Sequence, residues 1–387
     1  MFCYNTWLGD FMEYLDLPLI GKKNLSINAR YFSDIKDELE EFLVDEDEIN
    51  SRKFVKKIMF NQEIKSNNTI EGINDDLMLI EKVIRDVSSI KDVLQRKRII
   101  NLYHGYKYIL SHRVIDESHL KELYGILSDG LIEDRDLANM GQVYREAPVY
   151  ILKKGRLDTE LDQGLPYEMV PEYMKIYFDY VNNGFEGTIT DQFIKSQIMH
   201  FYFVYIHPYF DANGRTSRTL AMWYLLNSKA YPYIIFNRAI TNNGDSGYDE
   251  SIIDAKNSAD ISFFIKYMMI NVKRELEKEI IMSEIKNNTS YKMDAMNFQT
   301  LNYILSMNGE INVLNFVTMY RRNNNYKKVQ DIYEESLQPL KDMGIIYVVR
   351  QTKKMMFLDY PNEVFKINPS RFDRNNPKIR RLDLCNK

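Results

Sequence analysis

The sequence predicts a mainly helical protein with a small β-hairpin and, near its C-terminal end, a module of three helices and two strands. Long apolar runs on both sides of residues 207–218 are dense enough for buried helices. Residues rich in β propensity flank Pro148 and indicate the hairpin. Beyond about residue 292, three helical patterns precede two short strand patterns around a basic turn. We therefore expect one central helical bundle and one smaller appended module.

Composition bounds the kind of protein. The 387 residues suffice for two to three domains, and a 45% hydrophobic content with 13% aromatic residues is ample for packed cores. The formal charge of −4 excludes a generally basic nucleic-acid coat. Cys3 and Cys385 stand at opposite ends, which excludes a disulfide framework or zinc spacing. No signal-like or membrane-length apolar run occurs, so we expect a cytoplasmic protein without membrane contact.

Five segments are expected along the chain. They are an N-terminal helical region (1–95), a helical core (96–276), a polar linker (277–291), the C-terminal module (292–360) and a polar, basic tail (361–387).

The most informative stretch is residues 207–218. The apolar run 192–206 predicts a buried helix, and Pro208 disfavours the α conformation for the residue before it. The helix should therefore end at His207. Residues 211–214 then form an Asp-Ala-Asn-Gly turn signal, in which the glycine permits close approach of a ligand.

A second buried helix is predicted from Arg215 onward, so the turn leads into a helix N-terminus, a natural phosphate cradle. Arg215 and Arg218 are three residues apart, and both guanidiniums can reach the same polyphosphate. Asp211 is placed to hold a Mg²⁺ that bridges phosphate oxygens, and His207 can act as a base. Together these residue types predict a nucleotide site.

This stretch resembles the signature of the Fic domain family, which runs from His-Pro-Phe through an acidic residue and Asn-Gly to two arginines. Tyr209 stands where the family usually has Phe, and its hydroxyl needs a partner if the ring is buried. The resemblance implies a Fic-fold helical bundle with a hairpin flap. The matching residues are His207, Pro208, Asp211, Ala212, Asn213, Gly214, Arg215 and Arg218.

Fic proteins typically transfer AMP from ATP to a hydroxyl on a target protein, and the resemblance implies the same nucleotidyl transfer here. His207 would deprotonate a Ser, Thr or Tyr hydroxyl, which attacks the α-phosphate and expels pyrophosphate. Asp211 would bind Mg²⁺. Arg215 would hold the inner phosphates and Arg218 the γ-phosphate.

Three further binding residues follow from the resemblance. Asn213 and Gly214 would contribute to the anion-binding nest, and Tyr248 lies where relatives often place an adenine-side tyrosine. A relative that phosphorylates instead carries Lys where Gly214 stands. Gly214 and Arg218 therefore favour nucleotidyl transfer over kinase chemistry.

A second segment suggests regulation. Gly72 is a plausible C′ cap of a preceding helix, which puts Glu71 in the last turn, where its charge opposes the helix dipole. The segment resembles the family's inhibitory helix, whose Glu pairs with the second arginine of the signature and blocks productive ATP binding. That relation implies a Glu71–Arg218 pair, with Asn67 at the motif's Ser/Thr position. The plainer alternative is a solvent-facing Glu at a helix end.

Residues 141–152 carry strand-forming residues on both sides of Pro148. They resemble the family's flap, a hairpin that lies over the site and pairs with the target as an added strand. The alternative is a purely structural hairpin. The flap residues expected to dock the target are Val143, Tyr144, Arg145, Val149 and Tyr150.

The C-terminal module reads as a winged helix, with helices over 298–307, 313–320 and 326–343 and strands over 344–349 and 355–358. Such domains often bind DNA, but the third helix is acidic and contains Pro339. Protein docking or dimerisation is therefore an equal alternative. Basic residues available for phosphate contacts are Arg321, Arg322, Lys327, Lys328, Lys353 and Lys354.

The sequence thus predicts a protein adenylyltransferase that uses ATP and Mg²⁺, is autoinhibited by Glu71, and acts on an unidentified target protein or on itself within a homodimer. Two alternatives stay open. One is removal of AMP from a modified protein, with Glu71 positioning water. The other is a non-enzymatic regulator that keeps the Fic scaffold and binds DNA through the C-terminal module.

Overall fold

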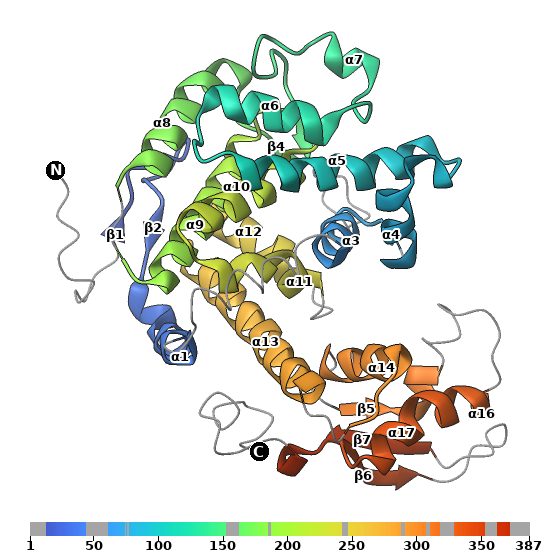
Figure 1. The fold of residues 1–387 in the computed structure, drawn as a ribbon. Helices are drawn as coiled ribbons and strands as arrows, with labels where there is room; N and C mark the ends of the chain where they lie inside the picture. Colours follow the sequence, from blue (N-terminus) through green and yellow to red (C-terminus); the bar gives the residue numbers. More distant parts are fainter. Residues whose placement is uncertain are drawn as a thin grey trace. The chain divides into compact units, whose positions relative to one another are not determined.

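The computed structural model describes residues 13–43, 61–73, 75, 77–151, 162–184, 187–241, 247–287, 291–306, 310–317, 329–352 and 362–371. The chain divides into two compact units, Met1–Val272 and Lys273–Lys387. Figure 1 shows that both are built mainly of helices with short antiparallel strands. None of the helices in these ranges is long and apolar enough to cross a membrane.

The first unit is built around the helix pair α9 (Ile189–Ile206) and α10 (Asn213–Asn227), which pack against each other. Nearly every side chain of both helices is buried, as their apolar sequences predict. Helix α9 begins before the predicted start at residue 192 because Thr188 and Asp191 form a capping box. The loop between α9 and α10 therefore has a rigid helix on each side.

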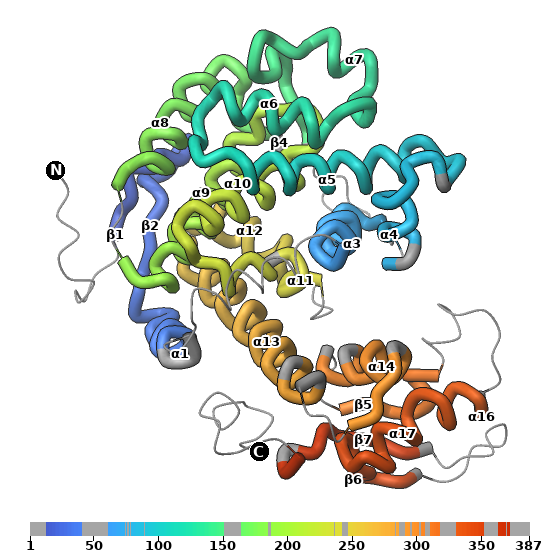
Figure 2. Tube along the Cα trace, viewed as in Figure 1, coloured from blue at the N-terminus to red at the C-terminus, as the bar shows by residue number. Residues whose placement is uncertain are grey.

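Further helices enclose this pair. Helices α5 and α6 pack on each other and on α10, while α8 and α1 pack on α9 (Figure 1). The tube in Figure 2 follows the path from α5 through α6 and α8 to α9. Their bounds are α1 Ser33–Leu43, α5 Val93–Ser111, α6 Glu117–Ser128 and α8 Val170–Asn182.

The N-terminal region contributes α3 (Asn61–Ile70), which packs on α4, α5 and α11. It also forms a two-stranded sheet that the sequence did not reveal, β1 with β2, and Ser26 of β2 makes a bridge to Asp260. The remaining elements of this unit are β1 Glu13–Tyr14, β2 Ser26–Ile27, η1 Ala29–Phe32, α4 Leu77–Arg85, η2 Val87–Ser89, α7 Asp134–Leu137, η3 Tyr167–Met169, η4 Tyr231–Ile235, α11 Phe236–Thr241 and α12 Gly247–Ser258.

The hairpin is present, but its strands differ from the prediction. Strand β3 (Tyr150–Ile151) pairs with β4 (Asp162–Gln163), so the turn does not lie at Pro148. Before the proline, the backbone N–H of Arg145 donates to the carbonyl of Pro208 at 3.0 Å. That N–H group is therefore committed to the α9–α10 loop.

Most of the segment 277–291, expected as a linker, is helical, because helix α13 runs from Ser262 to Asn287. The charged residues 272–286 predict such a helix, and the polar signal for a linker comes from residues 287–290, of which 288–290 lie outside the described residues. The division between the two units, after Val272, falls within this helix.

The second unit holds a three-stranded antiparallel sheet in the order β5-β7-β6. The predicted strand over 355–358 lies outside the described residues. The central strand, β7, belongs to the segment predicted as a polar tail, where Val364, Phe365 and Ile367 supply the buried side chains. The bounds are α14 Ala295–Ser306, β5 Glu310–Asn312, α16 Val329–Ile332, α17 Gln338–Asp342, β6 Ile346–Thr352, β7 Asn362–Ile367 and η6 Pro369–Arg371; residues 313–317 are also helical.

Pro339 does not end the third helix of this unit. A π-helical turn over Tyr333–Leu337 separates α16 from α17, and Pro339 occupies the first turn of α17, where its missing N–H is tolerated. The six basic residues predicted to contact DNA lie outside the described residues, so DNA binding stays a prediction.

Candidate active site

The loop between α9 and α10 bends sharply at two residues. His207, the C-cap of α9, has φ 52° and ψ 60°, and Ala212, the N-cap of α10, has φ 60° and ψ 13°. The left-handed region is costly for residues other than glycine, so both need support from their surroundings. The predicted helix end at His207 is confirmed, and the following proline excludes the right-handed α conformation there.

Asn213 holds the loop together. Its Oδ1 accepts the backbone N–H of Tyr209 at 3.0 Å, and its Nδ2 donates to the carbonyl of Tyr209 at 2.8 Å. The side chain is 2% exposed. Both ends of the amide are thus committed to the backbone of the loop. Asn213 shapes the anion-binding turn by this contact, a role that its place in the signature alone does not specify.

The imidazole of His207 is oriented through one ring nitrogen. Nδ1 lies 3.3 Å from the carbonyl oxygen of Val204, one helical turn earlier. Because a carbonyl only accepts hydrogen bonds, this contact places the proton of a neutral ring on Nδ1. Nε2 is then the basic nitrogen. His207 is partly exposed at the end of α9, where a base can meet an incoming hydroxyl.

The N-terminus of α10 forms the floor of the site. Ala212 provides no side-chain cap, so the N–H groups of the first turn have no acceptor within the helix. A Cβ on Gly214 would lie 2.9 Å from Glu71 Oε1 and 3.0 Å from Arg218 Nη1. A side chain at this position would therefore press on this charged pair. Aligned N–H groups and a side-chain-free Cα suit the binding of phosphate.

Both arginines of the signature are buried. Arg215 is 8% exposed, and burial lowers the pKa of its guanidinium although Glu71 and Asp211 oppose that effect. Arg218 is 2% exposed, and its Nη2 donates to Glu71 Oε1 at 2.5 Å and to Asn67 Oδ1 at 2.8 Å. Burial opposes the charge of Arg218, but Glu71 and then Tyr248 outweigh it and raise its pKa.

Glu71 is delivered to Arg218 by the end of α3. Gly72 has φ 83°, its N–H donates to the Thr69 carbonyl at 2.9 Å, and the N–H of Ile73 donates to the Asn68 carbonyl at 2.9 Å. These two bonds form a Schellman motif with Gly72 at C′ and Glu71 at the C-cap. A carboxylate at this end of a helix is unfavourable by itself. Arg218 supplies the compensating cation.

Asp211 is exposed, and its Oδ1 accepts the N–H of Ala212 at 2.6 Å. Its Oδ2 has no hydrogen bond within the described ranges. The same ranges contain no group of three His, Cys, Asp or Glu side chains that could hold a metal ion. Binding of Mg²⁺ by Asp211 stays a prediction.

Sequence comparison agrees with this geometry. Residues 114–225, which include α9, the loop and most of α10, match the sequence model of the Fic/DOC family. The chain contains a Fic/DOC family domain.

The fold is also similar to that of a solved structure. A Fic family protein from Desulfovibrio desulfuricans G20 matches with a TM-score of 0.53 and 17% identity over 87% of this chain and 96% of that protein. A fragment of Fic-1 from C. elegans matches with a TM-score of 0.49 and 18% identity over 67% of this chain and 73% of that fragment. No curated protein matches the sequence. At these identities the first likeness shows the fold alone.

Behind the Fic loop, Tyr248 and His200 continue the contacts of Arg218. Tyr248 is 6% exposed, hydrogen-bonds Arg218, and places its hydroxyl 2.6 Å from His200 Nε2. Burial lowers the pKa of His200 to about 3. His200 is thus a neutral core histidine, as its spacing from His207 predicts. Contact between Tyr248 and an adenine ring stays a prediction, since its hydroxyl is engaged in this buried network.

The residues expected to form the docking flap differ in how far their side chains are exposed. Tyr144, Arg145 and Val149 are buried at 7%, 1% and 8% exposure, Val143 is half-buried, and Tyr150 is 60% exposed. The three buried side chains pack against the domain and are not available to a target. Strand addition at β3 stays a prediction, with Tyr150 as its accessible side chain.

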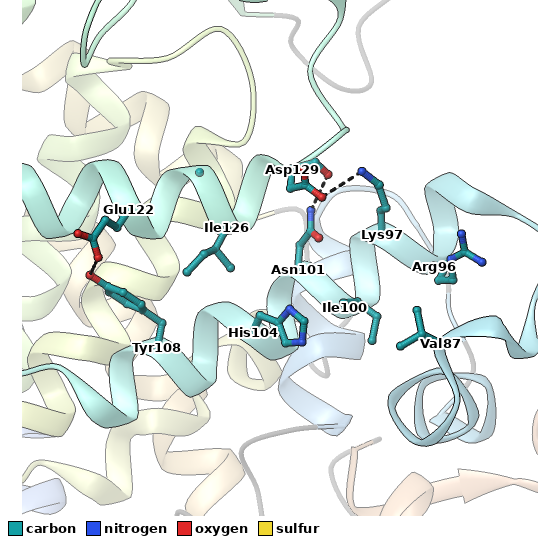
Figure 3. A pocket seen from close by; sticks show the side chains of 11 residues that line it. Val87, Arg96, Lys97, Ile100, Asn101, His104, Tyr108, Glu122, Ile126 and Asp129 are labelled. Carbon is teal, nitrogen blue, oxygen red and sulfur yellow. Dashed lines mark hydrogen bonds and ion pairs between the residues drawn. The ribbon is translucent and has the colours of Figure 1, made fainter.

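A groove of about 740 Å³ lies between α5 and α6 (Figure 3), apart from the Fic loop. Tyr108 donates to Glu122 at 2.8 Å at one end, and Lys97 donates to Asp129 at 3.0 Å at the other. None of the predicted site residues lines it. The predicted nucleotide site therefore rests on the loop and the N-terminus of α10.

Proposed function

We propose that this protein transfers AMP from ATP to a hydroxyl group of a protein side chain, on a separate target or on its own chain. The observation that carries the proposal is the convergence of His207, at the end of α9, with an uncapped helix N-terminus and two buried guanidiniums at the start of α10. A base beside a phosphate cradle suits the attack of a hydroxyl on phosphorus.

Each residue has a distinct task in this reaction. His207 Nε2 takes the proton as the hydroxyl oxygen bonds to the α-phosphorus, and the bond from that phosphorus to pyrophosphate breaks. Arg215 and the first-turn N–H groups of α10 neutralise the charge that develops on the phosphate oxygens. Arg218 holds the γ-phosphate and so fixes which phosphorus faces His207.

A magnesium ion would supply further charge neutralisation between the phosphates. Asp211 is the residue to hold it, because its carboxylate is exposed beside the cradle and Oδ2 is available for coordination. One carboxylate with phosphate oxygens and water is a usual Mg²⁺ arrangement.

Glu71 would regulate the reaction. Its carboxylate lies 2.5 Å from Arg218 Nη2, in the place where the γ-phosphate of ATP needs the same guanidinium. Two anions cannot share one partner without repulsion, so the triphosphate would have to displace Glu71. Glu71 is 31% exposed and ends its helix, so displacement needs only a local change at the end of α3.

The test compares wild type, Glu71→Gly and Glu71→Gly/His207→Ala, incubated with Mg²⁺ and ATP labelled at the α- or the γ-phosphate. Glu172→Gly, an exposed glutamate at the start of α8, is the matched control for loss of a carboxylate. Label is followed on the protein itself and on proteins of a cell lysate. We expect protein-bound α-label that rises in Glu71→Gly, is lost with His207→Ala and is unchanged in the control.

The other outcomes refute particular parts of the proposal. Bound γ-label would mean phosphorylation. Equal α-label in wild type and Glu71→Gly would refute inhibition by Glu71. The absence of both labels would refute AMP transfer and favour AMP removal, which a protein already carrying AMP would reveal through release of AMP that depends on Glu71.

A further inference from the structure

We propose that Arg145 is a positioning residue that holds His207 in its working orientation, and not a contact for the target protein. This inference rests on the proposed function, in which His207 is the base. Arg145 belongs to the predicted flap, and it binds the backbone of the α9–α10 loop through its side chain and its own N–H group.

Arg145 satisfies the two peptide carbonyls at the start of the loop. Its Nε donates to the carbonyl of His207 at 2.8 Å, and its backbone N–H donates to the carbonyl of Pro208 at 3.0 Å. The N–H of His207 is held by the Phe203 carbonyl at 3.0 Å. Asn213 binds both the N–H and the carbonyl of Tyr209. Every backbone hydrogen-bonding group from His207 through Tyr209 therefore has a partner.

These contacts matter because His207 is left-handed, with φ 52° and ψ 60°. A residue with a Cβ keeps such a backbone conformation only when its surroundings enforce it. The carbonyl of His207 can point at Arg145 Nε only in a narrow range of ψ, and this bond therefore opposes relaxation of the loop. The backbone angles at His207 in turn aim its imidazole, whose Nδ1 also makes the long 3.3 Å contact to the Val204 carbonyl.

The rest of the guanidinium is fixed as firmly. Nη1 donates to the carbonyl of Ala147 at 2.9 Å, and Nη2 donates to the carbonyl of Leu165. The side chain is 1% exposed, and burial lowers its pKa only to about 10, so it stays charged at neutral pH. Arg145 therefore joins the flap, the segment after β4 and the catalytic loop, and no surface remains for a target.

Gly164 allows the segment after β4 to pack closely against Arg145. A Cβ at this position would lie 2.6 Å from Val149 Cγ1, 3.1 Å from Arg145 Nη2 and 3.4 Å from the Cβ of His207. The segment after β4 thus packs directly on both the arginine and the base. Gly164→Ala would clash first with Val149 and press on Nη2 of Arg145, so it disturbs the surroundings of this side chain without removing it.

The first experiment needs no catalytic activity. The full-length protein is labelled with 15N at its five histidines, and the imidazole signals of His207 are assigned by their loss in His207→Gln. We expect one set of His207 signals in the unmodified protein, with the proton on Nδ1. In Arg145→Lys, whose single ammonium cannot reproduce the fork of hydrogen bonds, and in Gly164→Ala, we expect His207 to show exchange between tautomers and orientations.

Tyr144→Phe is the matched control. It removes the neighbouring bond from Tyr144 to Glu117, at 2.8 Å, and leaves the loop carbonyls untouched. It should not alter the His207 signals. If Arg145→Lys and Gly164→Ala fold and both keep the His207 signals of the unmodified protein, the positioning role is wrong.

The second experiment is kinetic, in the Glu71→Gly background. Arg145→Lys should lower kcat for AMP transfer roughly 100-fold, as expected for misplacement of a reacting group by about 1 Å, and leave KM for ATP unchanged. A rise in KM for the acceptor protein with kcat retained would instead mean target contact and would overturn the inference. If Glu71→Gly itself transfers no AMP, the proposed function fails, while the 15N spectra still decide whether Arg145 positions His207.

Discussion

Arg218 Nη2 lies 2.8 Å from Asn67 Oδ1, so Asn67 binds the same guanidinium nitrogen as Glu71. The two residues are four apart at the end of α3 and lie on one face of it. Asn67 also donates to the Tyr106 hydroxyl at 3.3 Å, and it is fully buried. The segment of α3 and its C-cap therefore contacts Arg218 through two side chains, of which only Glu71 is charged.

From this relationship we predict that Asn67→Ala, like Glu71→Gly, weakens the inhibited state in which Arg218 is held by these two residues, and that the two effects add. A hydrogen bond to a charged group contributes about 1.5–3 kcal/mol, so the apparent affinity for Mg²⁺-ATP should increase roughly 10-fold or more. The affinity is measured by calorimetry on Asn67→Ala, Glu71→Gly and the double variant. The double variant should bind ATP most tightly, and equal affinity in the double and Glu71→Gly variants would show that Asn67 takes no part.

Gly72→Ala should loosen the end of α3 that carries Glu71. Gly72 has φ 83°, and a Cβ in the left-handed region costs about 1–2 kcal/mol. The Schellman motif that places Glu71 is therefore destabilised, and ATP should bind more tightly than in the unmodified protein. Calorimetry with ATP and a thermal unfolding curve measure the two effects. If the variant is measurably less stable but binds ATP with unchanged affinity, the helix cap at Gly72 takes no part in regulation.

Tyr209→Phe should stabilise the protein by about 1 kcal/mol. Tyr209 is fully buried and stacks on Tyr124 with ring centroids 3.5 Å apart, but its hydroxyl has no hydrogen-bond partner within the described residues. Removing a buried, unpaired hydroxyl removes its desolvation cost and keeps the ring. Chemical denaturation measures the change. Tyr144→Phe serves as the opposite case, since its hydroxyl donates to Glu117 and its removal should destabilise.

His200 should make the protein less stable in mildly acidic solution. Burial lowers its pKa in the folded state to about 3, whereas the unfolded chain takes up a proton near pH 6.5. Between these values the unfolded state binds more protons, so the free energy of unfolding falls by about 1.4 kcal/mol for each pH unit below 6.5. His200→Gln, which keeps a polar group near Tyr248, should lose this part of the pH dependence. If the free energy of unfolding has the same pH dependence in both proteins between pH 6.5 and 4, His200 is not the group responsible.

The chemistry of the α9–α10 loop could be predicted from the sequence because its determinants are local. Pro208 ends one helix, the turn before Arg215 begins the next, and the spacing of Arg215 and Arg218 puts both on one helix. The approach of Glu71 to Arg218 was expected only through the family resemblance. These residues are 147 positions apart, and no local pattern records a contact over that separation.

The secondary structure was predicted least well where one segment depends on another. Strand β7 was assigned to a tail although β6 directly precedes it in the chain, because its other partner, β5, is distant in sequence and the polar residues around β7 hide its apolar positions. Strand pairing is decided by such long-range partners, whereas helix propensity is expressed within a few residues.

Local residue patterns were enough to predict which chemical groups gather around residues 207–218: a base, a carboxylate, two guanidiniums and a helix N-terminus. Which of them are held, and by what, depends on contacts between distant parts of the folded chain. The tertiary structure turned Arg145 inward onto the carbonyl of His207, committed Asn213 to Tyr209, and gave Arg218 a second acceptor in Asn67. The reason is physical: a hydrogen bond requires its atoms to approach within about 3 Å, and only the packed chain fixes such distances between remote residues.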